Sequence, residues 1–263
     1  MARFRTLASS SSGNCTYISA SGGTLLVDVG ISFRRLTQSL CELDAHPRQL
    51  AAVLITHEHI DHVRGLRQLT EKTDITVCAS GAVLEYLLDY NHLAAKTSLI
   101  EVNGATFCVG DMEVTAFHTS HDSVDSVGYR IVTPDGHRIA VATDLGVVTD
   151  EVDRGVTGCE LVMLEANYDD TMLWNGSYPY PLKRRIASAL GHLPNDQTAA
   201  WACRLLGLGT TRLMLAHLSR ENNRPALAFD TVDGALRQTG ALAGVDYQLD
   251  VAPYDDAGRL VML

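Results

Sequence analysis

The chain has 263 residues, of which 46 % are hydrophobic, and its formal net charge is −10. This length suits one large domain or two small ones, and the acidic balance argues against non-specific binding to nucleic acid. No stretch approaches the ~18 apolar residues of a membrane-spanning helix, and the N-terminal segment lacks the apolar run of a signal peptide. Six cysteines are scattered without a C-x-x-C pair, which is typical of free, mostly buried thiols. We therefore expect a soluble cytoplasmic protein.

Short apolar segments bounded by turn residues predict β-strands along the chain. In chain order they are Thr24–Asp28, Ala51–Thr56, Ile75–Cys78, Glu113–His118, Ser126–Thr133, Arg138–Thr143, Leu161–Glu165, Arg212–Ala216 and Tyr247–Val251. Segments that begin near a Ser, Asp or Pro predict helices. These are Ser32–Leu43, Gly81–Tyr90, Pro181–Leu190, Thr198–Leu206 and Asn223–Gln238. Because no composition break occurs, we expect one layered α/β domain over residues 1–263, with helices outside the sheets.

A dense group of metal-ligand side chains follows the second of these strands. His57, His59, Asp61 and His62 lie within the sequence HEHIDH, which begins where the strand Ala51–Thr56 ends. Strand ends of layered α/β folds are where ligand sites collect. A tight turn there can aim His57 and His59 at one point and Asp61 and His62 at a second. Imidazole and carboxylate ligands suit zinc, manganese or iron.

Three further ligand types each follow an apolar strand, namely His121, Asp144 and His217. His118 competes with His121, but the two point to opposite faces of a strand and His121 lies nearer the strand's exit. We expect Asp144 to bridge two divalent ions that share a hydroxide nucleophile. One ion would be completed by His57, His59 and His121, and the other by Asp61, His62 and His217.

The signature T-H-x-H-x-D-H at Thr56–His62, followed by Gly65, resembles that of the metallo-β-lactamase superfamily. The resemblance runs from LLVDVG at Leu25–Gly30 to the strand before Leu218, and it implies a four-layer αββα sandwich with a dinuclear site at one edge. Six motifs in order are similar to the YycJ/WalJ branch: SSSSGNCTYI, LLVDVGIS, HTSHDSVDSVGYRI, LEANYDDTML, GHLPNDQTA and LAHLSRENNRPALA. That resemblance implies a 5′-to-3′ exonuclease acting on DNA, with a role in DNA repair.

Two spacings separate this chain from other branches. The 73 residues from Asp144 to His217 leave no room for the β-CASP insert of RNA-processing nucleases. The 23 residues from His121 to Asp144 leave no room for the tRNA-gripping arm of many tRNase Z enzymes. Both RNA-processing alternatives are therefore weakened.

Phosphodiester hydrolysis also needs a group that protonates the leaving oxygen, which is worth about 10²–10⁴-fold in rate. By resemblance to related nucleases, we expect His192 to be this general acid, oriented by Glu165. Asp61 is expected to act in catalysis as well as in metal binding. The alternative is that His192 packs in a loop and Glu165 satisfies backbone donors.

Several residues could contact a nucleic acid. The segment LWNGSYPYPLKRRI places Trp174, Tyr178 and Tyr180 before Lys183, Arg184 and Arg185, so bases could stack on rings while phosphates meet cations. We expect Lys183 to bind substrate, although a loop packed by its own aromatics is an equal alternative. Among Ser219, Arg220 and Asn223, which follow His217, we expect at least one to touch substrate. The SSSSGN loop, with Ser12 and Asn14, could also present N–H groups to a phosphate, although an ordinary Gly turn is the favoured alternative. Asp28 is expected to hydrogen-bond a ligand histidine.

The leading hypothesis is thus a metal-dependent exodeoxyribonuclease that uses two divalent ions, zinc or manganese, with iron a weaker match. The main alternative is a hydrolase of small esters, thioesters or lactones on the same scaffold. A redox di-iron protein is disfavoured because flavodiiron relatives typically carry Glu where His59 stands. A binding module without catalysis would not require all seven ligands.

Overall fold

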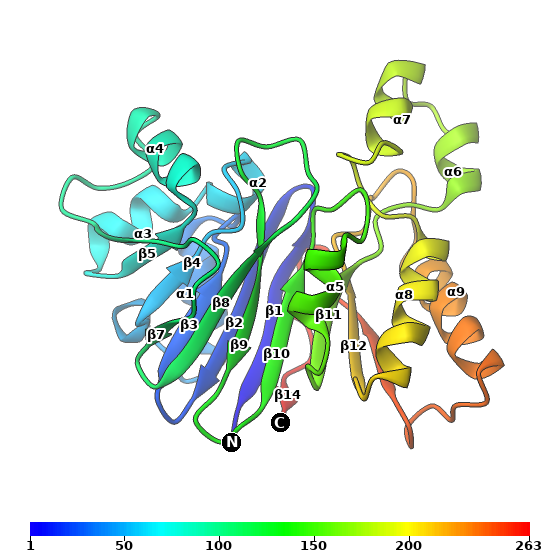
Figure 1. The fold of residues 1–263 in the computed structure, drawn as a ribbon. Coiled ribbons are helices and arrows are strands. Elements are labelled where there is room, and N and C mark those ends of the chain that lie inside the picture. The colour runs from blue at the N-terminus through cyan, green and yellow to red at the C-terminus, as the bar shows by residue number, and fades with distance from the viewer.

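The computed structural model describes residues 1–263 and contains two seven-stranded sheets packed face to face (Figure 1). The first sheet has the order β14-β1-β2-β3-β4-β5-β6 and the second β13-β12-β11-β10-β9-β8-β7. The first is built from β1 Arg3–Ser10, β2 Gly13–Ala20, β3 Gly23–Val27, β4 Ala52–Leu54, β5 Thr76–Ala79, β6 Ser98–Glu101 and β14 Val261–Met262. The second is built from β7 Phe107–Val109, β8 Met112–His118, β9 Val127–Val132, β10 Arg138–Ala142, β11 Leu161–Glu165, β12 Arg212–Ala216 and β13 Gln248–Val251.

Helices cover the outer faces of both sheets, so the architecture is the predicted αββα sandwich. On the first sheet lie α1 Phe33–Cys41, α2 Ile60–Val63, α3 Leu66–Lys72 and α4 Gly81–Asp89, with a short 3₁₀ helix at Pro47–Gln49. On the second lie α5 Asp150–Val156, α8 Asn195–Gly207 and α9 Pro225–Gln238. α6 Asp170–Asn175 and α7 Tyr180–Ile186 project beyond the strand ends at the top of Figure 1.

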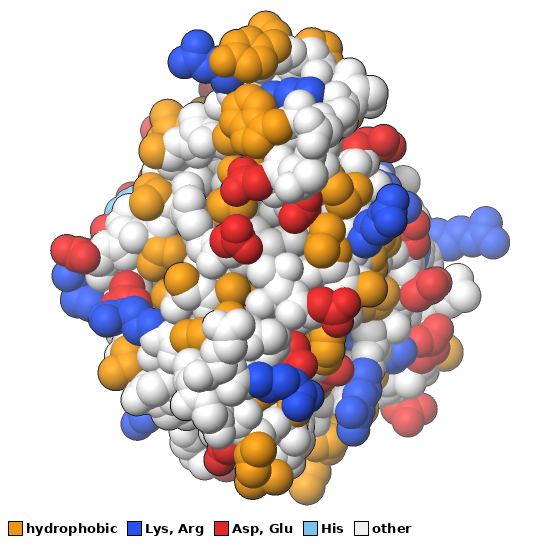
Figure 2. All heavy atoms as spheres, turned by 90° about the vertical axis from the view of Figure 1, so that its right-hand side faces the viewer, with side chains coloured by type: hydrophobic (Ala, Val, Ile, Leu, Met, Phe, Trp, Pro, Cys, Tyr) orange, Lys and Arg blue, Asp and Glu red, His pale blue; other side chains and the backbone are white.

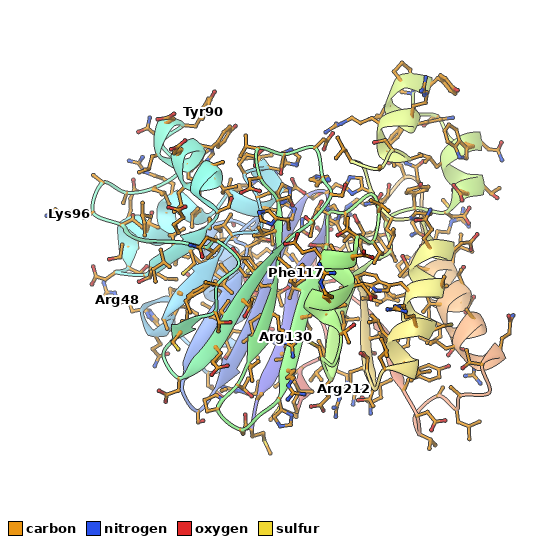
Figure 3. The ribbon with its side chains drawn as sticks, in the orientation of Figure 1. Arg48, Tyr90, Lys96, Phe117, Arg130 and Arg212 are labelled. Atoms are coloured by element: carbon orange, nitrogen blue, oxygen red, sulfur yellow. The ribbon has the colours of Figure 1, made fainter.

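Three apolar layers hold these elements together. One lies between the first sheet and α1, α3 and α4, one between the two sheets, and one under α5, α8 and α9. Phe117 on β8, labelled in Figure 3, belongs to the third layer and packs beneath α5. A Cβ at Gly155 of α5 would lie 2.4 Å from the Phe117 ring, so glycine permits this close approach.

All nine predicted strands and all five predicted helices are confirmed, with bounds that differ by a few residues. The largest difference is at α7, which ends at Ile186 and not at Leu190. The prediction missed β1, β2, β6, β7 and β14, and the helices α2, α3, α5 and α6. The cysteines are all unpaired as expected; three are buried, but Cys41 and Cys108 are exposed. None of the helices combines the length and apolarity that crossing a lipid bilayer requires.

The connectivity brings many strand ends to one edge. β3 to β6 pair in parallel in the first sheet, and β10 to β13 do so in the second. Parallel strands end at the same edge of a sheet, and this is where α2 and the projecting α6 and α7 lie (Figure 1). Arg130 and Arg212, labelled in Figure 3, lie toward the opposite end. The edge near α2 therefore collects the residues that follow the parallel strands.

Candidate metal centre

Seven predicted ligands from both sheets meet at this edge. His57, His59, Asp61 and His62 come from the segment between β4 and the end of α2, whereas His121, Asp144 and His217 follow β8, β10 and β12. Ligand atoms of His57, His59 and His121 lie within 4.8 Å of one another, and so do those of Asp61, His62 and His217. These are the two groups that the sequence predicted.

Asp144 lies between the two groups. Its Oδ1 is 3.3 Å from Nδ1 of His217 and 3.7 Å from Nε2 of His121. Its Oδ2 is 3.4 Å from Nε2 of His62. One carboxylate thus faces histidines of both groups, which is the arrangement that a bridging ligand requires.

Four of the histidines are oriented in the same way, with Nδ1 hydrogen-bonded to a fixed acceptor. The acceptors are Thr56 Oγ1 at 3.0 Å for His57, Asp28 Oδ2 at 2.8 Å for His62, the Gly191 carbonyl at 3.1 Å for His121, and Glu165 Oε1 at 2.9 Å for His217. Donation from Nδ1 leaves Nε2 without a proton in the neutral ring. Each ring is therefore held in the tautomer that a metal ion binds.

Asp28 fixes this segment through more than one bond. Its carboxylate accepts from the Thr56 backbone N–H at 2.9 Å and from Thr56 Oγ1 at 2.9 Å, as well as from His62. The predicted hydrogen bond between Asp28 and a candidate ligand histidine is thus present.

Strained backbone supports the same strand ends. Asp28, Asp144 and His217 adopt φ values of 61°, 58° and 56°, in the left-handed region. Non-glycine residues rarely adopt this conformation, and such residues cluster at functional sites. Each follows a strand of the parallel part of a sheet, where the turn aims its side chain at the centre.

Two buried atoms at the centre have no hydrogen-bond partner, Asp144 Oδ2 and His217 Nε2. Buried polar atoms are normally paired, so two unpaired ones in the same centre fit a place for a cation. Burial works against protonation of His217, yet Asp144, Asp61 and Glu165 raise its pKa to about 10. The site therefore attracts positive charge strongly, and the nitrogen and oxygen donors fit a divalent transition-metal ion.

Glu165 and His192 form the predicted pair. The carboxylate is fully buried, and its Oε1 lies 2.7 Å from Nδ1 of His192, whose side chain is 21 % exposed. Glu165 Oε2 also accepts from the Leu145 backbone N–H at 2.8 Å. Burial opposes ionisation of Glu165, but His192 and His217 lower its pKa, so it carries a negative charge. The pair satisfies both alternatives at once, because Glu165 orients His192 and also pairs a backbone donor.

The predicted substrate residues have different environments. Lys183 is buried, and its Nζ donates to the carbonyls of Trp174 and Gly176 at 2.9 and 2.7 Å. Ser219 and Asn223 are also buried, and Asn223 donates to Ala166 and Asn195. Their polar groups face inward and are paired within the fold, so substrate contact by these three residues stays a prediction.

Arg220 is partly exposed, but it pairs with Asp255 at 2.5 Å and stacks on Tyr254. Ser12 is exposed in the turn between β1 and β2, where its carbonyl accepts from Arg64. These two stay predictions.

Asn14 has a role that the sequence prediction assigned differently. It is buried, and its Nδ2 lies 3.2 Å from Asp61 Oδ2 and 3.0 Å from Nε2 of His62. It therefore contacts two candidate ligands, and its predicted contact with a substrate phosphate stays a prediction. Glu58 was also missed: its Oε1 accepts from the Val124 N–H at 3.1 Å, which ties the His57 segment to the His121 loop. Its place between two ligand histidines was the only signal in the sequence.

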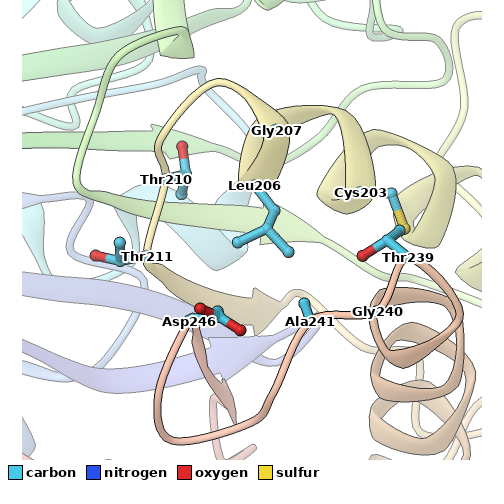
Figure 4. A pocket seen from close by; sticks show the side chains of 9 residues that line it. All are labelled: Cys203, Leu206, Gly207, Thr210, Thr211, Thr239, Gly240, Ala241 and Asp246. Atoms are coloured by element: carbon cyan, nitrogen blue, oxygen red, sulfur yellow. The ribbon is translucent and has the colours of Figure 1, made fainter.

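A separate hollow lies at the other end of the molecule. Figure 4 shows it between the ends of α8 and α9 and the start of β12, lined by Leu206, Thr210, Thr211 and Asp246 among others. His217 follows the opposite end of β12, so this hollow is not part of the candidate metal centre.

A family model for the beta-lactamase superfamily domain matches residues 24–218, so the chain belongs to that superfamily, as its motifs predicted. The exodeoxyribonuclease WalJ of Streptococcus pneumoniae is 36 % identical over 256 residues, covering 95 % of this chain and 94 % of that protein. The exodeoxyribonuclease YycJ of Bacillus anthracis is 32 % identical over 249 residues, with 94 % and 93 % covered. The Zn²⁺-bound PqqB of Methylobacterium extorquens shares the fold, with a TM-score of 0.74 at 20 % identity over 99 % of this chain and all of that one.

Proposed function

We propose that this chain is a metal-dependent exodeoxyribonuclease that hydrolyses DNA phosphodiester bonds from the 5′ end. Two relatives that span nearly the whole chain are named exodeoxyribonucleases, which supports DNA as the substrate. The observation that carries the proposal is the common orientation of His57, His62, His121 and His217, whose Nδ1 atoms are hydrogen-bonded so that Nε2 stays available for a metal.

The centre is proposed to hold two divalent ions, zinc or manganese. His57, His59 and His121 would hold one, Asp61, His62 and His217 the other, and Asp144 both. Such ions lower the pKa of water and neutralise charge on a phosphate. Asp28, Thr56 and Glu165 already orient the candidate ligand histidines. Little rearrangement is therefore needed to bind the metal ions.

The chain itself would supply the proton for the leaving oxygen. His192 is the partly exposed histidine beside the centre, with Nδ1 held by Glu165. That bond directs Nε2 away from Glu165, where it can donate to a substrate oxygen.

DNA would approach along the α6–α7 projection, residues 170–186. Trp174 and Tyr180 are 43 % and 65 % exposed there, and Arg184 and Arg185 are exposed beside them. Figure 2 shows apolar side chains gathered at the top of this face, with acidic side chains below them. Stacking on the rings and ion pairing with the arginines would hold the end of a strand locally, while the acidic remainder of the surface repels DNA. The unpaired cysteines agree with action in the cytoplasm.

A single assay tests the proposal. The metal-free protein is reloaded with zinc or manganese and incubated with duplexes labelled at the 5′ or 3′ end, and with a thioester and a lactone. We expect release of mononucleotides from the 5′ end only with metal, and its loss in His57→Ala. Turnover of the thioester or lactone without any release of nucleotides would contradict the nuclease function.

A further inference from the structure

An ion pair stands at the mouth of the candidate metal centre. Arg185 on α7 donates from Nε to Oδ2 of Asp122 at 2.5 Å, and the other carboxylate oxygen of Asp122 lies 3.6 Å from Nε2 of His121. The Arg185 side chain is 60 % exposed and that of Asp122 is 27 % exposed. The carboxylate thus separates the guanidinium from a nitrogen that faces the metal centre.

Asp122 occupies the Arg185 guanidinium, the cation that a phosphate of a nucleic acid would contact beside the candidate metal centre. Its carboxylate lies directly against the Arg185 guanidinium, so a phosphate that is to take that position must replace it. The chain carries a net charge of −10, so each cation near the centre matters for phosphate binding.

The ion pair is not needed to hold α7 in place. Ser120 Oγ donates to the Ala189 carbonyl at 2.7 Å, and His121 Nδ1 donates to the Gly191 carbonyl at 3.1 Å. These bonds already connect the loop after β8 to the segment after α7. Exposed ion pairs add little to stability, and the Arg185 guanidinium makes no other hydrogen bond within the protein.

On these grounds, and resting on the proposed function, we propose that Arg185 and Asp122 form an exchange site for a backbone phosphate of the bound strand. The phosphate displaces Asp122 and takes its place on the guanidinium. A guanidinium binds phosphate and carboxylate through the same planar donors, so the exchange keeps its hydrogen bonds. Arg185 is then a substrate-binding residue, and Asp122 lowers affinity for any nucleic acid that does not reach the centre.

The two variants should shift DNA affinity in opposite directions. The probe is a fluorescent duplex with a 5′-phosphate, titrated in chelator and in a series of salt concentrations, with anisotropy as the readout. Arg185→Ala should weaken binding about threefold or more and reduce the slope of log affinity against log salt by about 1. Asp122→Asn should tighten binding by a similar factor, and only while Arg185 is present. With manganese, Arg185→Ala should raise KM far more than it lowers kcat.

Two matched controls separate this exchange from a change of net charge. Arg184→Ala removes a neighbouring arginine that has no ion pair, and Glu71→Gln removes the acid of the exposed Arg67–Glu71 pair on α3. Glu71→Gln should leave affinity unchanged. Because Arg184 has no acidic partner, no replacement of a nearby acid should tighten binding through Arg184 as Asp122→Asn does through Arg185. If Asp122→Asn does not tighten binding, or tightens it equally in the Arg185→Ala background, the proposed exchange is contradicted. The proposed function then still stands, provided that the wild type degrades DNA. A wild type that neither binds nor degrades DNA overturns both this inference and the proposed function.

Discussion

His192 donates from Nδ1 to the buried carboxylate of Glu165 across 2.7 Å, while its own ring remains partly exposed at the edge of the metal centre. A histidine held in this way can transfer a proton at Nε2 without turning. The same Glu165 oxygen also accepts from Nδ1 of His217 at 2.9 Å, so one carboxylate orients both His192 and a candidate ligand histidine.

His192→Ala should lower kcat on DNA by about 10²–10⁴-fold and leave the metal content unchanged, because no candidate ligand is removed. Activity on 5′-phosphorylated duplexes and metal content by atomic emission measure the two effects. His118→Ala is the control, since His118 is exposed and pairs with Glu151. Full turnover of a metal-loaded His192→Ala protein would remove the assignment.

Asp28→Asn should weaken metal binding about 10- to 100-fold, the usual effect of losing a carboxylate that orients a ligand histidine. The amide can still accept from the Thr56 N–H, but it no longer matches the charge of the His62 ring. Competition with a fluorescent chelator gives the affinity. Unchanged affinity would mean that Asp28 serves only the backbone turn.

Metal loading should become tighter as pH rises, up to about pH 10, where His217 loses its proton in the metal-free protein. Although burial opposes it, Asp28, Asp144 and Asp61 raise the pKa of His62, and Asp144, Asp61 and Glu165 raise that of His217 to about 10. The metal-free protein therefore carries protons on these rings, and an ion must displace them. Each displaced proton raises apparent affinity about tenfold per pH unit. Calorimetry in buffers of different ionisation enthalpy counts the protons, and no release would refute the prediction.

Gly30→Ala should abolish metal binding. A Cβ at Gly30 would lie 1.6 Å from the Asp61 carbonyl oxygen and 2.6 Å from the Asn14 N, so the ligand segment would have to move. Gly207→Ala is the control, because a Cβ there meets nothing within 4 Å. Metal titration of both variants, with circular dichroism to verify folding, makes the comparison. Equal metal affinity in the two would be inconsistent with this packing.

Lys183→Met should loosen the α6–α7 projection while the sandwich remains folded. The buried ammonium satisfies the Trp174 and Gly176 carbonyls, and leaving such acceptors unpaired costs about 1–3 kcal/mol. Limited proteolysis should cut residues 170–186 about tenfold faster or more, with little change in the midpoint of global unfolding. Arg184→Met should resist cleavage like the wild type. A lowered unfolding midpoint without faster cleavage would contradict a local role.

The sequence predicted the strands whose apolar runs end in polar ligand types, and that is why the centre could be located. β11 and β12 were predicted to the residue because LVMLE and RLMLA are apolar runs with clear ends. β1 was missed because Thr6, Ser9 and Ser10 are polar but buried, so RFRTLASS does not read as a core strand. α6 was missed because its six residues lack a helical period.

Burial of polar groups explains why the surroundings of some predicted substrate residues could not be foreseen from the sequence. Lys183 follows two tyrosines and precedes two arginines, which favours a solvent-facing cation, yet two backbone carbonyls hold it inside. Asn14 was placed in a phosphate-binding loop, but the hairpin of β1 and β2 turns it toward Asp61. Such pairings depend on how the chain turns back on itself, and composition alone carries no signal for them.

The candidate ligands come from both halves of the sandwich, since the segment after β4 belongs to the first sheet and His217 to the second. Bound cations would therefore add cross-links between two parts of the polypeptide that only a few hydrogen bonds, such as those of Glu58 with Val124 and of Ser9 with His217, join at this rim. Starving a cell of its transition metals would then do more than silence the enzyme, because the uncross-linked chains would open at the rim and become substrates for quality-control proteases.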